Sequence, residues 1–466
     1  MGQPPASPVA VPGASPQDNA APKLQRVLGL NDLVFYGLVL LQPVGIMGLY
    51  GVATARSHGH TSTSILIAMG AMLVTSVSYG RMAALYPSAG SAYTYVGRGL
   101  NPHLGFLAGW TMVMDYVIIP VVNVIYGALS AGRLVPVVPY WAWVLVFALG
   151  MTVLNTRGIR ATARANQILM AAMVAVAVAF VVAAVRHLFH TAGWPGLVSL
   201  APFYNPATFN FGDVCMATSF AAAAYVGFDG ITTLAEDARE PKRTVPLATV
   251  LVCLVTGLTA ILLAYLAQRV SPDLQKFTNE ETMFMDIATV VGGPWLFSAI
   301  AVIMAVTCFG SGLTSQVGAA RLLYSMGRDN VLPRAVFGRL DSHNAPTLNI
   351  WLIGLLALGG AFVLNYERAT ELVNFGAFLA FMGVNAAAIR TFWFNPPPGH
   401  RRKWLTDLMV PAIALVFCFL IWWSLPKPAK IAGCIWFAVG VLYAAIKTRG
   451  FRRRPAMLDF SDANHA

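Results

Sequence analysis

Long apolar runs dominate this chain and leave few folds open to it. A helix that crosses about 30 Å of hydrocarbon needs roughly 20 largely apolar residues. Such runs recur at about residues 31–55, 62–86, 101–132, 138–156, 162–185, 211–238, 246–268, 293–318, 347–365, 370–394, 406–425 and 429–446. Because backbone groups in lipid must be hydrogen-bonded within their own segment, each run predicts a helix. The sequence therefore predicts an all-α membrane protein with twelve transmembrane helices.

Composition argues against the main soluble classes. Hydrophobic residues make up 57% of the 466 residues and charged residues 11%, whereas soluble domains carry about 25% charged residues. The 5 Cys lie inside apolar runs without paired spacing and the 8 His lie in loops or tails, so neither a disulfide framework nor a metal site is expected. No Gly-rich stretch carries a Walker lysine, so no nucleotide cofactor is expected.

The distribution of Lys and Arg predicts the orientation in the membrane, since cytoplasmic loops are enriched in these residues. With both termini in the cytoplasm, most of the 31 Lys and Arg residues fall in cytoplasmic segments. This asymmetry accounts for the net charge of +12 without a nucleic-acid partner. We expect a disordered cytoplasmic tail at residues 1–25, a transporter domain at 26–450 and a cytoplasmic tail at 451–466. The expected location is the cell (inner) membrane.

Two of the runs contain residues that interrupt helices. The first holds Pro43, which lacks a backbone donor, followed by Gly45, Gly48 and Gly51. The sixth reads Tyr225-Val226-Gly227-Phe228-Asp229-Gly230. These runs occupy equivalent positions if the chain consists of two repeats, at about 31–185 and 211–394, followed by helices 11 and 12 at about 406–446. Paired interruptions are typical of transporters with inverted repeats and a midplane substrate site. The alternative is a small-residue packing face with a proline kink.

A break in a helix frees backbone groups that can bind charged parts of a ligand. Amides at the start of the second half-helix, at Val44, Gly45, Ile46, Met47 and Gly48, could bind a carboxylate, because the helix dipole is positive there. Carbonyls near Ala224, Tyr225 and Gly227 could accept hydrogen bonds from an ammonium group. An α-amino acid carries both charges, whereas an amine or polyamine carries only the second.

Acids are rare at membrane depth, and only Asp115 and Asp229 lie deep. Intramembrane acids serve substrate recognition or proton carriage in many transporters. For Asp229 the alternative is a structural role, in which the acid caps amides freed by the break. Glu236 lies near the cytoplasmic end of the sixth run, and Ser311 offers a hydroxyl in the eighth. Close helix packing is the alternative for Ser311.

Three segments together resemble one family of transporters. Tyr86 to Tyr95 with Asn101-Pro102-His103 is similar to the loop between spans two and three of amino acid–polyamine–organocation (APC) permeases. Glu236 to Pro246 resembles their exit from span six, and Arg321 to Asn330 their exit from span eight. Since these segments cover spans one to nine in order, the chain is identified as an APC superfamily member, most similar in motif to putrescine importers.

The resemblance implies a LeuT-type five-plus-five inverted repeat with broken helices 1 and 6. It also implies a substrate site between spans one, three, six and eight. Tyr116 and Glu236 match residues that putrescine importers use for substrate. The importers have an acid where this chain has Gly48, which favours an amino acid or monoamine over a diamine. Span five has Asn166 and Gln167 but no Lys, so the coupling ion, proton or sodium, stays open.

The sequence therefore predicts a secondary active transporter that moves amino acids or small amines by alternating access, as a monomer or homodimer in the lipid bilayer. A putrescine or polyamine importer is the close alternative. A membrane-embedded enzyme would need a catalytic constellation at membrane depth, and a non-transporting nutrient sensor usually adds a soluble domain. Neither feature is evident in the sequence.

Overall fold

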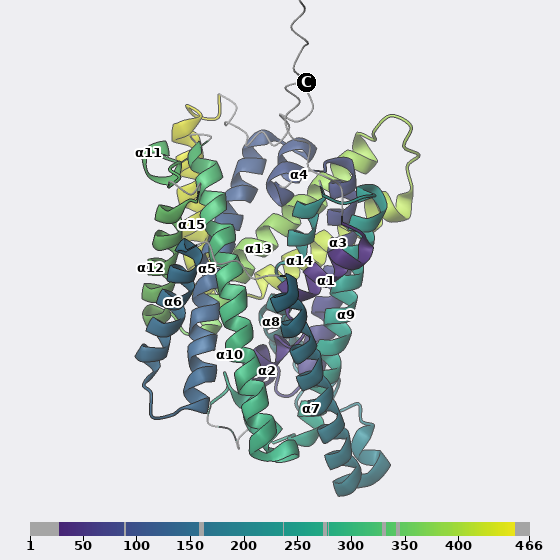
Figure 1. The fold of residues 1–466 in the computed structure, drawn as a ribbon. Helices are drawn as coiled ribbons and strands as arrows, with labels where there is room; N and C mark the ends of the chain where they lie inside the picture. Colours follow the sequence, from purple (N-terminus) through teal and green to yellow (C-terminus); the bar gives the residue numbers. More distant parts are fainter. Residues whose placement is uncertain are drawn as a thin grey trace, which may run out of the picture.

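The computed structural model folds into a bundle of helices (Figure 1). It describes residues 28–87, 90–157, 163–235, 237–273, 277, 279–328, 332–341 and 345–452. In chain order the helices are α1 (Leu30–Leu41), α2 (Ile46–Arg56), α3 (Thr61–Leu85), α4 (Ser91–Gly99), α5 (Pro102–Leu134), α6 (Tyr140–Thr156), α7 (Ala163–Leu197), α8 (Phe211–Ala221), η1 (Ala222–Tyr225), η2 (Phe228–Leu234), α9 (Pro241–Val270), α10 (Met283–Arg328), α11 (Arg334–Phe337), α12 (Thr347–Val363), α13 (Tyr366–Ile389), η4 (Arg390–Phe394), η5 (Trp404–Met409), α14 (Val410–Trp423) and α15 (Lys427–Lys447).

The lengths of these helices match the thickness of a membrane. Among the described residues, nine helices are long and apolar enough to cross a bilayer, and the bent pair of α1 and α2 makes a tenth span if it is counted as one. Two shorter helices, α6 and α12, are also apolar. The predicted all-α membrane architecture is therefore confirmed at this level, as a multi-pass membrane protein.

The first predicted interruption separates α1 from α2. The two helices meet at an angle of 53°. Between them, Gln42 adopts a left-handed conformation with φ 51°, and Pro43 follows it without an amide hydrogen to continue the helix. A local feature of the sequence therefore ends α1 at Leu41, and α2 starts in a new direction.

The second predicted interruption follows α8. The chain continues as the 3₁₀ turn η1, after which Val226 is extended, with φ −64° and ψ 128°. Gly227 then takes φ 110°, a backbone conformation that glycine adopts without the steric cost of a Cβ atom. The chain re-enters a helical conformation in η2, so the sixth run also departs from a continuous α-helix.

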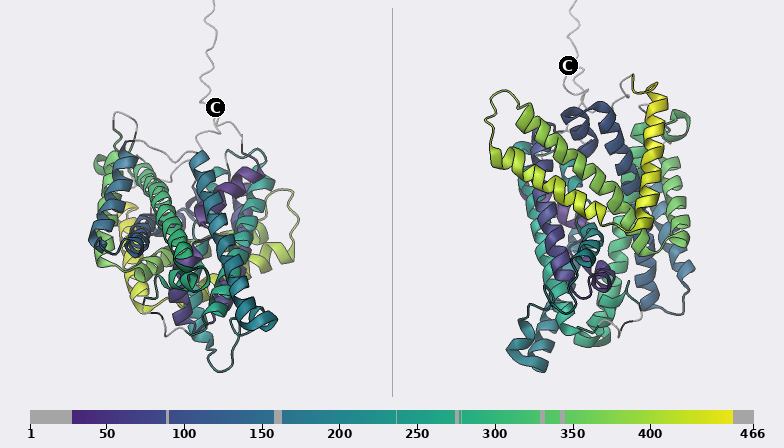
Figure 2. Two further views of the ribbon diagram at one scale, coloured as in Figure 1. Left: turned by 60° about the horizontal axis from the view of Figure 1, so that its bottom comes forward. Right: turned by 180° about the vertical axis from the view of Figure 1, so that it is seen from behind.

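The two broken segments lie inside a frame of long helices. α5 packs along α10, α12 and α13, and α3 packs along α9. Figure 2 shows α13 and α14 as an oblique pair on the side of the bundle that faces away from the viewer in Figure 1. We name the two ends of the bundle after α5: the Pro102 end, which also carries α4 at the top of Figure 1, and the Leu134 end.

Candidate functional site

A cavity of about 1570 Å³ lies between the two broken segments, α5, α10 and α13. Sites for small molecules usually have volumes of about 300–1000 Å³, so this cavity includes an access path. Asp32, Arg157 and Arg321 line it and are exposed at the Pro102 end. The cavity therefore reaches the surface at that end of the bundle.

The structure brings together only part of the predicted site. The predicted residues that line the cavity are Gly45, Asp115, Tyr116, Ala224, Gly227, Asp229 and Ser311. The predicted residues that are instead buried in helix packing, outside the described lining of the cavity, are Val44, Ile46, Met47, Gly48 and Tyr225. Glu236 lies outside the described residues.

The amides at the start of α2 already have partners within the chain. The amide of Gly45 donates to the carbonyl of Gln42 at 2.6 Å, and that of Gly48 donates to the carbonyl of Gly45 at 3.0 Å. Met47 donates to Val44 at 2.9 Å. Tight turns of this kind satisfy the first amides of a helix from within the turn. In this conformation these three amides are not free to bind a substrate carboxylate.

Tyr225 faces away from the cavity. A Cβ atom placed on Gly257 of α9 would lie 2.8 Å from the Tyr225 hydroxyl oxygen, so this side chain packs against α9. The turn of η1 decides this direction, because a 3₁₀ turn rotates side chains differently from an α-helix. Ala224, its neighbour in the sequence, lines the cavity instead.

Asp229 lies in a small polar cluster on the first turn of η2. Ser91 at the start of α4 donates a hydrogen bond from its hydroxyl to the Asp229 carboxylate at 3.3 Å. Thr232 donates to the backbone carbonyl of Asp229 at 2.6 Å. The helix dipole favours an acid at this position. Asp229 is therefore held in place by its own helix and by α4, and its side chain also borders the cavity.

Asp115 has a different environment, although it lines the same cavity. It sits on α5 and is 5% exposed. Its Oδ1 atom has no hydrogen-bond partner among the described residues. A buried carboxylate without a partner is costly, so it attracts a cation or a proton. Asp115 is therefore an acid of the described cavity lining with an unsatisfied carboxylate oxygen.

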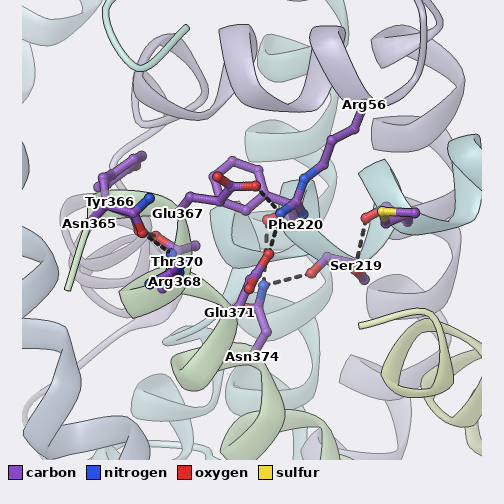
Figure 3. Close-up of polar contacts among 11 residues, drawn as sticks. Arg56, Ser219, Phe220, Asn365, Tyr366, Glu367, Arg368, Thr370, Glu371 and Asn374 are labelled. Carbon is purple, nitrogen blue, oxygen red and sulfur yellow. Dashed lines mark hydrogen bonds and ion pairs between the residues drawn. The ribbon is translucent and has the colours of Figure 1, made fainter. Parts of the chain in front are cut away.

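A cluster of charged side chains closes the Leu134 end (Figure 3). Arg56, the last residue of α2, forms ion pairs with Glu367 and Glu371 on α13. We call these three residues the Arg56 cluster. The Arg56 guanidinium also lies over the ring of Phe220 on α8, at 5.1 Å from its centroid. One arginine thus connects α2, α8 and α13.

Further contacts between α8, α13 and α5 lie next to this cluster. Asn374 donates a hydrogen bond to the carbonyl of Ser219 at 2.7 Å (Figure 3). The ring of Tyr366 lies 4.7 Å from that of Tyr126 and 6.3 Å from that of Phe220, between centroids. Tyr366 and Tyr126 line the cavity, so aromatic rings separate it from the Arg56 cluster.

The loop before α10 adds acids to this end. Burial raises the pKa of Glu281 above its ordinary value of 4.5, and the charge of Glu367 adds to this shift. Hydrogen bonds from the backbone at Tyr366 and Glu367 partly oppose it.

The sequence placed Arg56 and Glu371 near the ends of their spans, but nothing in it showed that they meet.

Comparison with known proteins agrees with this architecture. The family model described as "Amino acid permease" matches residues 33–446. The low-affinity putrescine importer PlaP of Escherichia coli (strain K12) is 32% identical, over 92% of this chain and 95% of its own length. The branched-chain amino acid permease BcaP of Bacillus subtilis (strain 168) is 24% identical, over 91% and 94%. The methylthioribose transporter of the same organism is also 24% identical, over 91% and 94%.

These relatives are named as transporters or permeases, which points away from an enzyme. Their names cover an amine, amino acids and a modified sugar, so the family does not fix the substrate. The match extends over most of the helical bundle, including both broken segments and the residues around the cavity. The chain therefore belongs to the amino acid permease family of the APC superfamily, as a multi-pass membrane transporter.

Proposed function

We propose that this permease is a secondary active transporter for a small organic amine, which it moves across the cell membrane by alternating access. In this proposal twelve helices span the membrane, as two inverted repeats of five and two further helices. The cation distribution supports a cytoplasmic Pro102 end and cytoplasmic termini. The conformation described here is then open to the cytoplasm and closed to the outside.

The observation that carries the proposal is the buried carboxylate of Asp115, whose Oδ1 atom has no hydrogen-bond partner among the described residues, in a cavity that Asp229 also lines. An ammonium group satisfies a buried carboxylate by charge and by hydrogen bonds. The amides of Gly45, Met47 and Gly48, which could have bound a substrate carboxylate, donate within the chain. The first fact favours a ligand with an ammonium group, and the second favours an amine over a zwitterionic amino acid, which also carries a carboxylate.

Amino acids are the second candidate, since Gly45 and Ala224 line the cavity at the two breaks. A movement that opened the turn before α2 would free its amides. The relatives named as branched-chain amino acid permeases support this alternative.

Uptake by purified protein in lipid vesicles tests the two candidates. We expect accumulation of labelled amines such as putrescine or butylamine when a proton or sodium gradient is imposed, and comparison of the two gradients identifies the coupling ion. A hydrogen bond to a charged group contributes about 1.5–3 kcal/mol, so Asp115→Asn should raise the KM for amines at least tenfold. Uptake of alanine, isoleucine or arginine, with no uptake of or competition by any amine, would refute the proposal.

A matched control variant tests whether the effect of Asp115→Asn depends on the position of the acid in the cavity, or follows from removing any acid. Asp213 lies in the first turn of α8, on the same broken span as Asp229, and faces His58 at 3.4 Å. It is not part of the described lining of the cavity. Asp213→Asn should therefore leave the KM for amines within about twofold of the unmodified protein.

A further inference from the structure

The loop between η4 and η5 carries three consecutive cations, Arg401, Arg402 and Lys403, and residues 395–403 contain no acid. All three residues are exposed. No ion pair of the described residues includes any of them. We call these three residues the basic loop. Its charge is not neutralised by another described part of the chain, so it attracts an anion.

Asp407 of η5, which follows the basic loop, holds it in a defined shape. This acid is 0% exposed. One carboxylate oxygen accepts a hydrogen bond from the backbone amide of Lys403 at 2.7 Å and contacts Nε2 of His400 at 2.9 Å. The other oxygen pairs with Arg81 of α3 at 2.5 Å. Asp407 is therefore engaged by the backbone of the loop and by α3, and it does not neutralise the exposed cations.

Aromatic residues flank the basic loop on both sides. Phe394, the last residue of η4, is 64% exposed, and Trp404, the first of η5, is 60% exposed. Phe394 ends one candidate membrane span and Trp404 begins the next. The guanidinium of Arg402 lies over the ring of Trp393, at 6.0 Å from its centroid. Because aromatic residues at the ends of spans mark the boundary between membrane and water, the cations lie at the depth of lipid headgroups.

The position of the basic loop in the bundle gives lipid access to it. Figure 2 shows the connection between α13 and α14 extending outward at the Pro102 end. None of residues 395–403 belongs to the described lining of the cavity. Leu405, next to Trp404, is 61% exposed, so apolar surface adjoins the cations. A molecule with an anionic group and an apolar part fits this combination better than a free anion does.

We propose that the basic loop, with Trp404 and Leu405, is a docking surface for anionic phospholipid. The cations bind the phosphate of the headgroup, which accepts charge-assisted hydrogen bonds from arginine and lysine, and the two apolar side chains lie against the acyl chains. Each cation near an anionic membrane surface favours binding by about fivefold, and three together by on the order of a hundredfold. This inference does not depend on the transported substrate.

Thermal unfolding of the purified full-length protein in detergent tests the docking surface, since a ligand that binds the native state raises its unfolding temperature. The probes are dioleoylphosphatidylglycerol, which is anionic, and dioleoylphosphatidylcholine, which is zwitterionic. We expect the anionic lipid to stabilise the protein at a half-saturating concentration at least about tenfold below that of the zwitterionic lipid. Replacing all three cations of the basic loop by Gln should remove this difference and leave the effect of the zwitterionic lipid unchanged.

The matched control removes three other exposed cations, Arg239, Lys242 and Arg243, which are also replaced by Gln. They lie at the same end of the bundle, because the amide of Arg239 donates to the carbonyl of Leu28, just before α1, at 2.9 Å. An acid, Glu240, stands among them in the sequence. This variant should shift the half-saturating concentration of the anionic lipid by less than about twofold.

Three results would overturn the docking surface. If the basic-loop variant keeps the preference for anionic lipid, these cations do not bind it. If both triple variants lose the preference equally, only the net charge of the protein matters. If inorganic phosphate at matched ionic strength protects the unmodified protein as well as the anionic lipid does, the loop binds a free anion instead.

Single substitutions keep the test decisive if the triple variant does not elute as a monodisperse peak in size-exclusion chromatography. Arg401→Gln and Lys403→Gln should each raise the half-saturating concentration of the anionic lipid about fivefold. No change in either would count against the proposal. Because the assay measures lipid binding without transport, its outcome is separate from that of the uptake experiments.

Discussion

Replacing Arg56 by Gln should open the Leu134 end of the permease, because it leaves two carboxylates of α13 without the cation that joins them to α2. Glu367 and Glu371 both pair with Arg56 in the closed conformation. A glutamine side chain at this position could donate a hydrogen bond to one of them but could not neutralise either charge. The substitution therefore destabilises the closed end more than it disturbs any single helix.

The burial of these side chains determines how much free energy the Arg56→Gln substitution should cost. The side chain of Arg56 is 13% exposed and that of Glu371 is 3% exposed, whereas that of Glu367 is 33% exposed. Removing one partner of a buried ion pair costs about 3–5 kcal/mol, and a partly exposed pair contributes about 0–1 kcal/mol. We therefore expect Arg56→Gln to destabilise the conformation with a closed Leu134 end by about 3 kcal/mol, relative to the conformation in which that end is open. Since 1.4 kcal/mol is a factor of ten, the open population should rise on the order of a hundredfold.

Cys308 provides the assay, because it lines the cavity and is buried. In a variant in which the other four cysteines are replaced by Ala, a membrane-impermeant maleimide is added from the outside of intact cells. Cys308 should react slowly in the parent and up to about a hundredfold faster with Arg56→Gln. The control is Arg133→Gln, since Arg133 pairs with Asp286 and joins α5 to α10 instead. It should change the rate by less than about twofold.

An unchanged labelling rate in the Arg56 variant would show that the aromatic contacts, not the ion pairs, hold this end closed. Equal acceleration in the Arg56 and Arg133 variants would show a general loosening of the bundle. Either result refutes the reasoning from the Arg56 cluster.

Three further predictions concern other parts of the molecule. Gln316 donates to the hydroxyl of Thr152 at 2.8 Å and accepts from the side-chain amide of Asn155 at 2.7 Å, so Gln316→Leu should destabilise the protein by about 1–3 kcal/mol and lower its unfolding temperature in detergent. Gly227→Ala places a Cβ atom on a residue with φ 110°. It should lower the free energy of unfolding by about 1–3 kcal/mol and lower the unfolding temperature in detergent. Burial raises the pKa of Glu281, so protonated Glu281 contributes favourably to the free energy of unfolding. This contribution is fully present below the ordinary pKa of 4.5 and is lost as the pH rises through the raised pKa. Glu281→Gln should therefore stabilise the protein at pH 7.5 but not at pH 4, and equal unfolding temperatures of the two proteins at both pH values would contradict this.

The sequence alone determined the features that depend on local chemistry. Apolar runs of membrane length predicted the helices, because lipid forces each segment to satisfy its own backbone. Pro43 and Gly227 marked the two interruptions, since one lacks a donor and the other tolerates positive φ. Asp115 and Asp229 stood out as candidates because charges at membrane depth are expensive and therefore rare.

Which of these residues share a cavity, and which face packed helices, depends on the arrangement of the helices in space. Whether the amides of α2 are free depends on the turn before it, and the direction of Tyr225 depends on the rotation of a 3₁₀ turn. Arg56 and Glu371 meet across more than 300 residues of sequence. Tyr126 carried no signal of its own, because an apolar run with an occasional hydroxyl is ordinary in a membrane helix. Contacts of this kind arise from how rigid helices pack against one another, and no local pattern in the sequence encodes that packing.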